Sequence, residues 1–218
     1  QSYDRAVEWY TKSAEQGYGE AQFQLGRFFY NGTGVTKNYE RAVYWYSKVA
    51  EQGHAITQYN LGCCFQYGEG VDKNLAKAIC LYTESAQQGY SDAQFKFGLC
   101  YQEGTGVSKD LSEGVEWYTK AAEQGHALAQ CNLGLCFVEG RGVEKCIDQA
   151  IIWYTMAAEQ GTEIAYFNLG LIEQERGLNL NKAIYWFTKA ASQGNMEAQQ
   201  RLLNLDPSYS VFECSDSE

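Results

Sequence analysis

The sequence predicts an all-α solenoid of helix-turn-helix repeats, and three observations support this fold class. Glycine recurs at a fixed interval of 36 residues, at Gly17, Gly53, Gly89, Gly125 and Gly161. The segments around these glycines repeat too, from WYTKSAEQG at residues 9–17 to WFTKAASQG at residues 186–194. Within each unit, apolar residues follow the spacing of two amphipathic helices. Such a period indicates stacked repeats rather than one globular core.

The helix before each spacer glycine, called helix B, is predicted to begin near residues 4, 40, 76, 112, 148 and 181. In the second unit it covers residues 38–52, where apolar side chains follow helical spacing. These side chains are Ala42, Trp45, Tyr46, Val49 and Ala50. Asn38, Asn74 and Asp110 fit the N-cap, since their side chains accept hydrogen bonds from unpaired backbone N–H groups. Asp110 and Glu113 together predict a capping box.

The helix after each spacer, called helix A, is predicted to begin near residues 19, 55, 91, 127, 163 and 196. Gly53 fits the left-handed position that ends the preceding helix B. Gly62 stands in the middle of helix A, where glycine costs about 1 kcal/mol relative to alanine. Its recurrence in the other repeats predicts that a Trp or Tyr side chain of helix B crosses close to the helix A backbone.

A Gly-x-Gly-Val turn connects helix A to helix B, as at residues 68–71, but residues 174–180 lack it. Because solenoid units contact only their neighbours, we predict one elongated domain over residues 1–205. Asp206-Pro207 ends the last helix, and residues 206–218 form an acidic, Ser-rich tail. In an alternative, Val211 and Phe212 of this tail cap the apolar face of the last repeat.

The formal net charge of −10 disfavours nucleic acid and anionic membranes as partners. No apolar run has the length of a membrane-spanning helix, so we expect no membrane insertion. The eight cysteines form no C-x-x-C motif and are interpreted as reduced core residues. Together with the lack of a visible signal peptide, they favour the cytoplasm. The chain starts at Gln1, midway through a unit and without Met, so we expect a fragment.

No motif predicts catalysis, a metal or a cofactor. His54 and His126 occupy the same repeat position two units apart, whereas a metal site needs clustered ligands. Periodic glutamates (Glu15, Glu51, Glu123, Glu159) and lysines (Lys37, Lys73, Lys109, Lys145) are interpreted as solvated edges. Neither a G-x-G-x-x-G nor a G-K-[ST] motif is present, and the G-x-S-x-G, S-x-x-K and H-E-x-x-H motifs of hydrolases are also absent.

The repeat resembles the Sel-1-like repeat family, a relative of the tetratricopeptide solenoids, over about residues 3–205. The positions that carry the resemblance in one repeat are Ala93, Gly98, Tyr101, Gly104, Gly106, Val107, Asp110, Trp117, Tyr118, Ala121, Ala122 and Gly125. The resemblance implies a right-handed α/α superhelix with helix A on its concave side, and a role as an adaptor that assembles other proteins. Some bacterial members carry one disulfide per repeat, an arrangement that the cysteines here do not keep.

By this resemblance, a stripe of helix A residues lines a groove for a partner. The candidate partner-binding residues are Phe23, Arg27, Tyr59, Asn60, Phe95, Leu99, Asn132, Leu135, Phe167 and Asn168. Side-chain amides in this stripe could bond to the backbone of an extended peptide, and the aromatic rings could supply apolar contacts. In the alternative, the aromatic rings pack between adjacent A helices and the Asn side chains face only solvent.

These features predict a non-catalytic scaffold that holds a protein or peptide on helix A. One alternative is a hydrolase of the β-lactamase type, an activity described for some cysteine-rich relatives. This alternative has no chemical basis in the sequence, because the S-x-x-K, S-D-N and K-T-G motifs are missing. The other alternative is a structural spacer within a larger regulatory protein.

Overall fold

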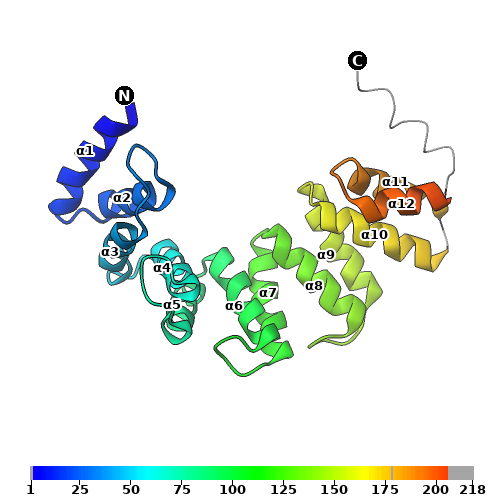
Figure 1. Cartoon of the computed structure of the whole chain (residues 1–218). Coiled ribbons are helices and arrows are strands. Elements are labelled where there is room, and N and C mark those ends of the chain that lie inside the picture. Colours follow the sequence, from blue (N-terminus) through cyan, green and yellow to red (C-terminus); the bar gives the residue numbers. More distant parts are fainter. Residues whose placement is uncertain (1, 178, 206–218) are drawn as a thin grey trace, which may run out of the picture. The chain divides into compact units, whose positions relative to one another are not determined.

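The chain folds into alternating A and B helices (Figure 1). The computed structural model describes residues 2–177 and 179–205, and within these ranges it contains twelve α-helices and no strand. The A helices are α2 (Gly19–Asn31), α4 (Ala55–Tyr67), α6 (Ser91–Glu103), α8 (Ala127–Glu139), α10 (Glu163–Arg176) and α12 (Met196–Leu205). The B helices are α1 (Ser2–Glu15), α3 (Tyr39–Ala50), α5 (Leu75–Gln87), α7 (Leu111–Glu123), α9 (Ile147–Glu159) and α11 (Leu180–Ala191).

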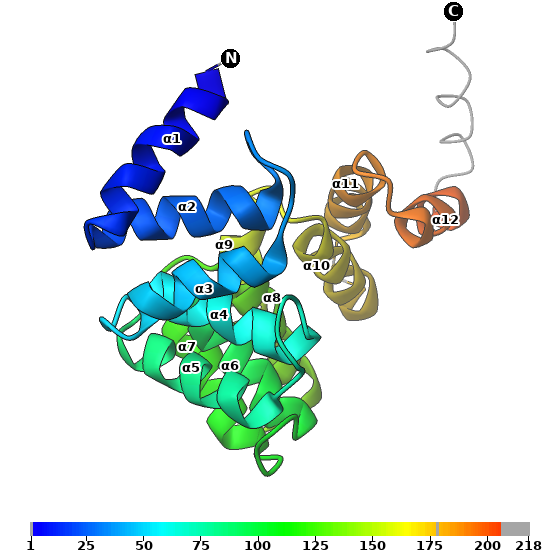
Figure 2. The same cartoon turned by 60° about the vertical axis from the view of Figure 1, so that its left-hand side comes forward.

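The helix order confirms the all-α repeat architecture that the sequence predicts. Every A helix begins at its predicted residue, and the B helices begin one residue earlier than predicted, or two in the case of α1. Four A helices pack most extensively on the B helix that follows them: α2 on α3, α4 on α5, α8 on α9, and α10 on α11. Figure 2 shows the pairs α2–α3 and α10–α11 from a second side.

The N-caps of the B helices confirm the predicted capping residues. The Asn38 side chain accepts a hydrogen bond from the Arg41 N–H at 2.9 Å, and Asn74 accepts one from the Lys77 N–H at 3.0 Å. Asp110 accepts from the N–H groups of Ser112 and Glu113 at 3.0 and 3.1 Å.

The capping box predicted at Asp110 and Glu113 is only half formed. In a capping box, the Glu113 side chain would accept a hydrogen bond from the Asp110 backbone N–H. This N–H donates instead to the Tyr101 carbonyl at 3.0 Å. The same bond joins Asn38 to Phe29, Asn74 to Phe65 and Cys146 to Phe137. The turn between the helices folds back onto helix A, so a backbone carbonyl takes the place of the carboxylate.

The spacer and mid-helix glycines have the two roles that their positions predict. Gly53 has φ +83°, in the left-handed region, and its N–H donates to the Ala50 carbonyl at 2.9 Å. The helix α3 itself ends at Ala50, two residues earlier than predicted. A Cβ added at Gly62 would lie 2.7 Å from a ring carbon of Tyr82. The ring that crosses helix A is therefore Tyr, or Phe187 in the last repeat, while the neighbouring Trp45 is only half-buried.

A series of four buried glutamines, to which the sequence analysis assigned no role, connects the A helices α2, α4, α6 and α8 to the preceding B helix. Their side-chain Nε2 groups donate to carbonyls in the last turn of that helix. The pairs are Gln22 with Ala14 at 3.0 Å, Gln58 with Ala50 at 3.5 Å, Gln94 with Ala86 at 3.2 Å, and Gln130 with Ala122 at 3.0 Å. The Gln that recurs three residues after the first residue of these A helices was the available sequence signal.

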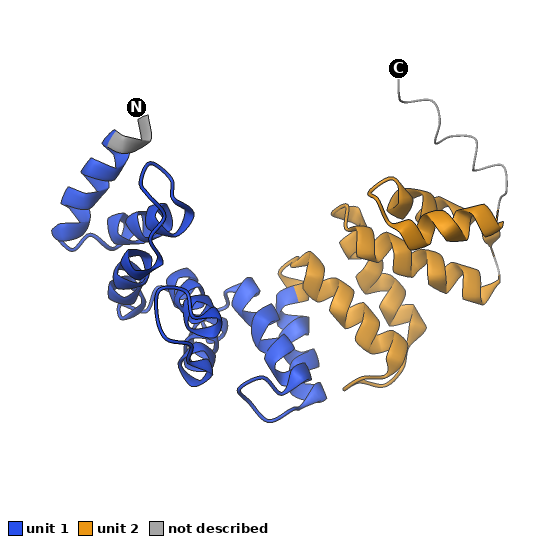
Figure 3. Cartoon of the chain, in the orientation of Figure 1, with its two compact units in different colours: residues 1–121 blue, residues 122–218 orange. Residues whose placement is uncertain are grey.

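The chain divides into two compact units, residues 1–121 and 122–218 (Figure 3). The core of unit 1 contains buried residues such as Leu25, Tyr46, Leu61, Tyr82 and Phe97. The core of unit 2 contains buried residues such as Tyr154, Leu169, Phe187 and Leu202. The predicted tail, 206–218, and Cys214 with it, lies outside the described residues.

The cysteines of the described chain are free thiols, as the sequence predicts. Cys64, Cys100, Cys131 and Cys136 are buried, and Cys63 and Cys146 are half-buried. Cys80 is exposed, so the interpretation of all cysteines as core residues is wrong at this position. Its place on α5 is the one that Tyr44 takes on α3, on the outer face of a B helix.

Among the described residues, no helix combines the length and the apolar character needed to cross a bilayer.

Candidate functional site

The ten predicted partner-binding residues lie on five successive A helices, two on each. Phe23 is buried and Arg27 is exposed on α2, whereas the other eight residues are half-buried. In order along the chain, these eight are Tyr59, Asn60, Phe95, Leu99, Asn132, Leu135, Phe167 and Asn168. The stripe thus lies between core and surface, where one side of a residue packs and the other meets solvent.

The aromatic rings of the stripe pack on the aromatic ring of the B helix in the same repeat. The centroid distances are 6.3 Å for Phe23 with Tyr46, 5.7 Å for Tyr59 with Tyr82, 5.7 Å for Phe95 with Tyr118, and 5.9 Å for Phe167 with Phe187. Two rings also reach the start of the next A helix, where Phe23 lies 5.2 Å from the His54 ring and Tyr59 lies 5.4 Å from Tyr90. Part of each ring is therefore used for packing within the fold. The alternative, in which the rings pack between adjacent A helices, is modified in that each ring packs on the B helix of its own repeat.

The side-chain amides at the repeat position of Asn60 differ in whether another protein group already forms a hydrogen bond with them. Gln24 donates to the Glu20 carboxylate at 2.7 Å, and Asn168 donates to the Ile164 carbonyl of its own helix at 2.8 Å. In the described part of the chain, no protein group forms a hydrogen bond with the side chains of Asn60 and Asn132. These two half-buried amides keep both donor and acceptor capacity for a partner.

A hollow of about 310 Å³ in unit 1 brings three of the predicted residues together. Arg27 comes from α2, and Tyr59 and Asn60 come from α4. The rest of the lining is Tyr30, Asn31, Tyr46 and Cys63. Asn31 and Tyr46 were not predicted, because Asn31 ends helix A and Tyr46 belongs to the core face of helix B. The remaining predicted residues lie on α6, α8 and α10 and do not line this hollow.

Arg27 is the charged residue of this hollow, and a short chain of hydrogen bonds orients it. Its Nη1 donates to the Gln24 Oε1 at 3.3 Å, and Gln24 in turn donates to Glu20. The guanidinium carbon lies 5.8 Å from the centroid of the Phe23 ring. A neutral amide thus separates the guanidinium from the carboxylate, and the positive charge remains available to a ligand.

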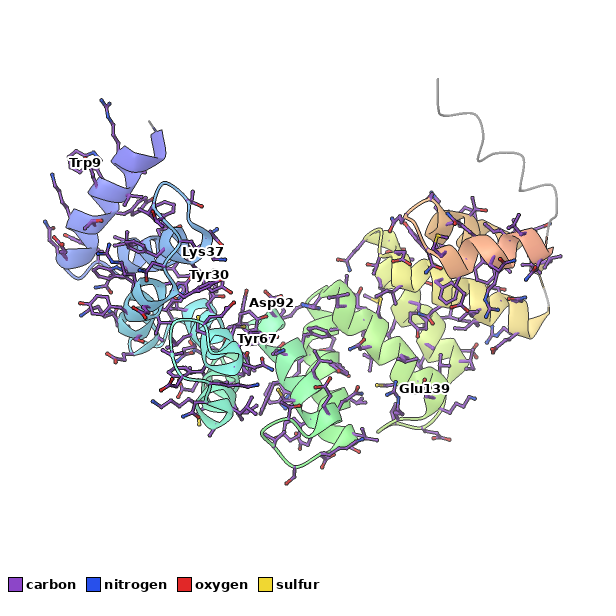
Figure 4. All side chains as sticks on the ribbon, in the orientation of Figure 1. Trp9, Tyr30, Lys37, Tyr67, Asp92 and Glu139 are labelled. Atoms are coloured by element: carbon purple, nitrogen blue, oxygen red, sulfur yellow. The ribbon has the colours of Figure 1, made fainter. Side chains whose placement is uncertain are left out.

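The phenols and the thiol of the hollow stay neutral near pH 7. Burial raises the pKa of Tyr59 and Tyr46, and it raises the pKa of the Cys63 thiol above its ordinary value. The Tyr30 Oη donates to the Glu69 carboxylate at 2.7 Å, and Figure 4 labels this tyrosine. Burial and this hydrogen bond raise the pKa of Tyr30. Raised pKa values make these groups poor nucleophiles and bases at neutral pH, so the hollow suits binding better than hydrolysis.

The two histidines cap A helices, a role that the sequence analysis missed. The Nδ1 atoms of His54 and His126 accept from the N–H groups of Thr57 and Ala129 at 3.3 and 3.1 Å. Both rings are half-buried rather than fully exposed loop residues. A search of the described residues finds no group of three or more His, Cys, Asp or Glu side chains arranged to hold a metal ion. The periodic glutamates and lysines are exposed, as expected of solvated edges.

A second hollow between A helices occurs in unit 2, where none of the ten predicted residues lines it. It has about 320 Å³ and lies between α10 and α12, with Gln174, Glu197 and Arg201 in its wall. Arg201 donates to Gln174 at 3.0 Å and forms an ion pair with Glu197 at 3.0 Å. Because a carboxylate already neutralises Arg201, this hollow offers less charge to a ligand than the one at Arg27.

Comparison with protein families matches almost the whole chain to one repeat. The model of the Sel1 repeat matches residues 1–18, 19–54, 55–90, 91–126, 127–162 and 164–195. The second to fifth matches begin at the first residue of an A helix, and the sixth begins one residue after α10 begins. No match to a curated protein sequence was found.

Solved structures with the same fold include two that share about a third of the sequence. A Sel1 repeat protein from Oxalobacter formigenes is 34% identical, with a TM-score of 0.84, and the match covers 93% of this chain and 82% of that protein. A protective antigen of uropathogenic Escherichia coli strains with an SLR fold is 33% identical, with a TM-score of 0.88 over 93% of this chain. This chain spans 44% of the length of that antigen.

An immunity protein from Pseudomonas aeruginosa shares the fold at lower similarity. It is 23% identical, with a TM-score of 0.54, and the match covers 84% of this chain and 68% of that protein. At this identity the likeness extends to the fold alone.

Proposed function

Because the chain belongs to the Sel1 repeat family, whose repeats commonly mediate protein interactions, we propose that it is a non-catalytic scaffold that holds a peptide or partner protein on its A helices. Sel1 repeat proteins are generally scaffolds rather than enzymes. The proposal adds the location of the binding surface in this chain and the residues that contact the partner.

The observation that carries the proposal is the hollow between α2 and α4. It combines an oriented cation at Arg27, an uncommitted amide at Asn60 and the aromatic wall of Tyr59. A peptide backbone offers both donors and acceptors, and a side-chain amide matches both. The aromatic wall supplies apolar contact of the kind that contributes most at interfaces.

The surface continues along the A helices of each unit, and the proposal assigns the other predicted residues to it. In unit 1, Phe95 and Leu99 of α6 are half-buried and occupy the repeat positions of Tyr59 and Cys63. In unit 2, Asn132 and Leu135 of α8 repeat the pairing of a free amide with an apolar side chain. Phe23 is buried, so we assign it to supporting Arg27 rather than to contacting the partner.

Selection of peptides against the intact chain tests this function. Peptides would be selected from a random display library, and their Kd values would then be measured against the Arg27→Glu and Asn60→Ala variants. We expect each substitution to weaken binding by about tenfold or more, since each removes a contact worth about 1.4 kcal/mol.

The matched control is Arg5→Glu, which makes the same change of charge at an exposed site on α1. We expect this control to stay within about twofold of the wild type. Selected peptides that bind the Arg27 and Asn60 variants as tightly as the wild-type chain would exclude the A-helix surface.

We also propose that the chain acts in the cytoplasm with protein partners and without nucleic acid. The support is the set of free thiols and the net charge of −10. Fractionation of cells that express the full-length protein, followed by immunodetection, tests the compartment. Recovery in an oxidising compartment would contradict it.

A further inference from the structure

Two B helices carry the same four-residue pattern on one face. It consists of Arg41, Tyr44, Trp45 and Lys48 on α3, and of Lys182, Tyr185, Trp186 and Lys189 on α11. The spacing i, i+3, i+4, i+7 places the four side chains on one side of a helix. The other B helices lack Tyr at the second position, where Glu8, Cys80, Glu116 and Ile152 stand instead.

Each pattern lies beside a groove between three helices. The groove at α3 has about 610 Å³ and is formed with α1 and α2, whereas the groove at α11 has about 300 Å³ and is formed with α9 and α10. Every residue that lines the smaller groove has its repeat equivalent in the larger one. The two grooves belong to different units, so one constellation is built twice in the chain.

The floors of the grooves are apolar and their aromatic walls are open to solvent. Val7 and Leu25 line one floor, and Ile151 and Leu169 line the other. Tyr44 is 55% exposed and Tyr185 is 53% exposed. Each exposed Tyr meets the adjacent Trp edge to face, at centroid distances of 5.0 and 4.8 Å. Exposed aromatic side chains beside an apolar groove are typical of interaction sites rather than of a solvated helix face.

The repeat position at which both grooves carry the same charge holds a cation. Arg41 and Lys182 stand at equivalent positions in the two linings. The second cation of each pattern lies over the exposed ring, with the Lys48 Nζ 5.1 Å from the Tyr44 centroid and the Lys189 Nζ 5.9 Å from the Tyr185 centroid. A carboxylate also lines each groove, but Glu15 and Glu173 occupy different repeat positions.

We propose that these two grooves bind an acidic segment of a partner protein, with an apolar side chain inserted between two carboxylates. The apolar side chain would fill the groove against Tyr and Trp, and the carboxylates would pair with the two cations. Positions i and i+7 of a helix are about 10 Å apart, which equals about three residues of an extended peptide. The site is distinct from the A-helix surface, because none of the ten residues of that surface lines either groove.

An acidic protein segment fits these grooves better than nucleic acid or a membrane. The net charge of −10 repels polyanions as a whole, so two local cations suffice only for a short acidic ligand. A concave groove also suits a single inserted side chain, whereas a membrane-binding helix presents a convex apolar face.

Calorimetric titration of the intact chain with a defined peptide tests the proposal. The probe is the decapeptide Gly-Ser-Asp-Glu-Leu-Phe-Asp-Glu-Ser-Gly, and we expect it to bind at two sites per chain. The Arg41→Glu/Tyr44→Ser variant and the Lys182→Glu/Tyr185→Ser variant should each retain one site. Their combination should retain none.

The controls separate recognition from loss of folding. Lys120→Glu makes the same charge change on α7, where Glu116 stands at the Tyr position of the pattern, and should leave two sites. Lys48→Glu and Lys189→Glu keep the rings in place and should each weaken one site at least about tenfold. Peptides with Ser-Ser in place of Leu-Phe, or with Lys in place of the acidic residues, should not bind.

Several results would overturn the proposal. One is a stoichiometry that the double substitutions do not change, and another is equal binding of the Lys-containing peptide. Binding of phosphatidylserine vesicles or a single-stranded oligonucleotide in preference to the peptide would assign the grooves to another ligand. Arg27→Glu should leave both sites intact, so failure here is distinct from failure of the proposed A-helix function.

Discussion

At the residue scale, the contact that recurs most faithfully joins a mid-helix glycine to an aromatic ring. Each of these glycines costs its A helix about 1 kcal/mol in helix propensity. In return, the rings of Tyr46, Tyr82, Tyr118, Tyr154 and Phe187 become buried against the backbone. A buried aromatic ring removes roughly 150–250 Å² from water, so the packing outweighs the propensity loss.

Replacement of Gly62 by Ala should therefore destabilise the chain although alanine favours helices. The added Cβ would lie 2.7 and 2.9 Å from two ring carbons of Tyr82 and 3.3 Å from the Ala78 carbonyl oxygen. We expect the free energy of unfolding to fall by about 1–3 kcal/mol, as measured by urea denaturation. The control Gly19→Ala, whose nearest atom is the Gln52 Oε1 at 3.2 Å, should change it far less. Equal effects would contradict this packing.

The hydroxyl groups of the crossing tyrosines are not equivalent. The Tyr82 Oη donates to the Gln66 Oε1 at 2.8 Å, whereas the buried Tyr154 Oη has no hydrogen-bond partner in the described chain. Tyr154→Phe should leave the free energy of unfolding unchanged or raise it by up to about 1 kcal/mol, because it removes an unpaired buried group. Tyr82→Phe should lower it by about 1 kcal/mol. Urea denaturation of both variants distinguishes them, and similar losses would refute the assignment.

At the element scale, the B helices differ in the quality of their N-caps. Asn38, Asn74 and Asn179 each accept a bond from a backbone N–H of the first turn. Cys146 holds the same position before α9, with φ −149° and ψ 99° against −151° and 101° for Asn38, but its side chain forms no cap bond. The backbone of α9 is thus prepared for a capping side chain that the sequence does not supply.

Cys146→Asn should therefore stabilise the chain. An Asn at an N-cap contributes about 0.5–2 kcal/mol relative to a residue that cannot cap. We expect the midpoint of thermal unfolding to rise in this variant and to fall in the matched variant Asn38→Ala. A Cys146→Asn chain that melts at or below the wild-type temperature would show that α9 gains nothing from a cap.

Prediction from sequence succeeds at this scale because helices are local structures. The capping residue, the apolar spacing and the terminal glycine all lie within one helix length of each other, as in residues 38–53. The prediction of a full capping box at Asp110 fails because it considered one helix only. The competing acceptor, the Tyr101 carbonyl, belongs to the preceding helix.

At the scale of the whole molecule, buried thiols make the free energy of unfolding depend on pH in the alkaline range. Burial raises the pKa of Cys64 and Cys131 from 9.0 to about 12, and that of Cys100 to about 11. The folded chain keeps these protons when the unfolded chain has lost them. Each thiol therefore contributes its full stabilisation below pH 9, and the contribution declines as the pH rises toward the folded pKa.

We expect the free energy of unfolding to decrease from pH 9 to pH 11, with a smaller decrease in Cys64→Ala. Buried tyrosines such as Tyr46 and Tyr154 act in the same direction at higher pH, because burial raises their pKa as well. Urea midpoints at several pH values measure the slope. The exposed Cys80 provides the control, since Cys80→Ser should keep the wild-type slope. A stability that rises with pH in this window would contradict the burial of the thiols.

The domain limits predicted from sequence, residues 1–205, stay a prediction at this scale. The chain divides into its two compact units between Ala121 and Ala122, within helix α7. A repeat pattern shows where each hairpin begins, but it carries no information on how firmly successive hairpins hold together.

The candidate sites show the limit of sequence reasoning most clearly. The stripe of A-helix residues follows from the repeat, yet its ten members differ in availability, from the buried Phe23 to the exposed Arg27. Tyr46 and Asn31 join the hollow although neither belongs to the stripe. The grooves beside Tyr44 and Tyr185 also escaped prediction, because their walls come from three helices.

The sequence by itself determined the repeat, the order and starts of the helices, most of their caps and the family. These follow from patterns within about 36 residues, where spacing alone decides which face of a helix is apolar. Only the tertiary structure decided which rings are covered, which amides and cations stay free, and where hollows form. Each of those outcomes depends on side chains from two or three helices meeting in space, and their joint shape and charge are not contained in the spacing of any one helix.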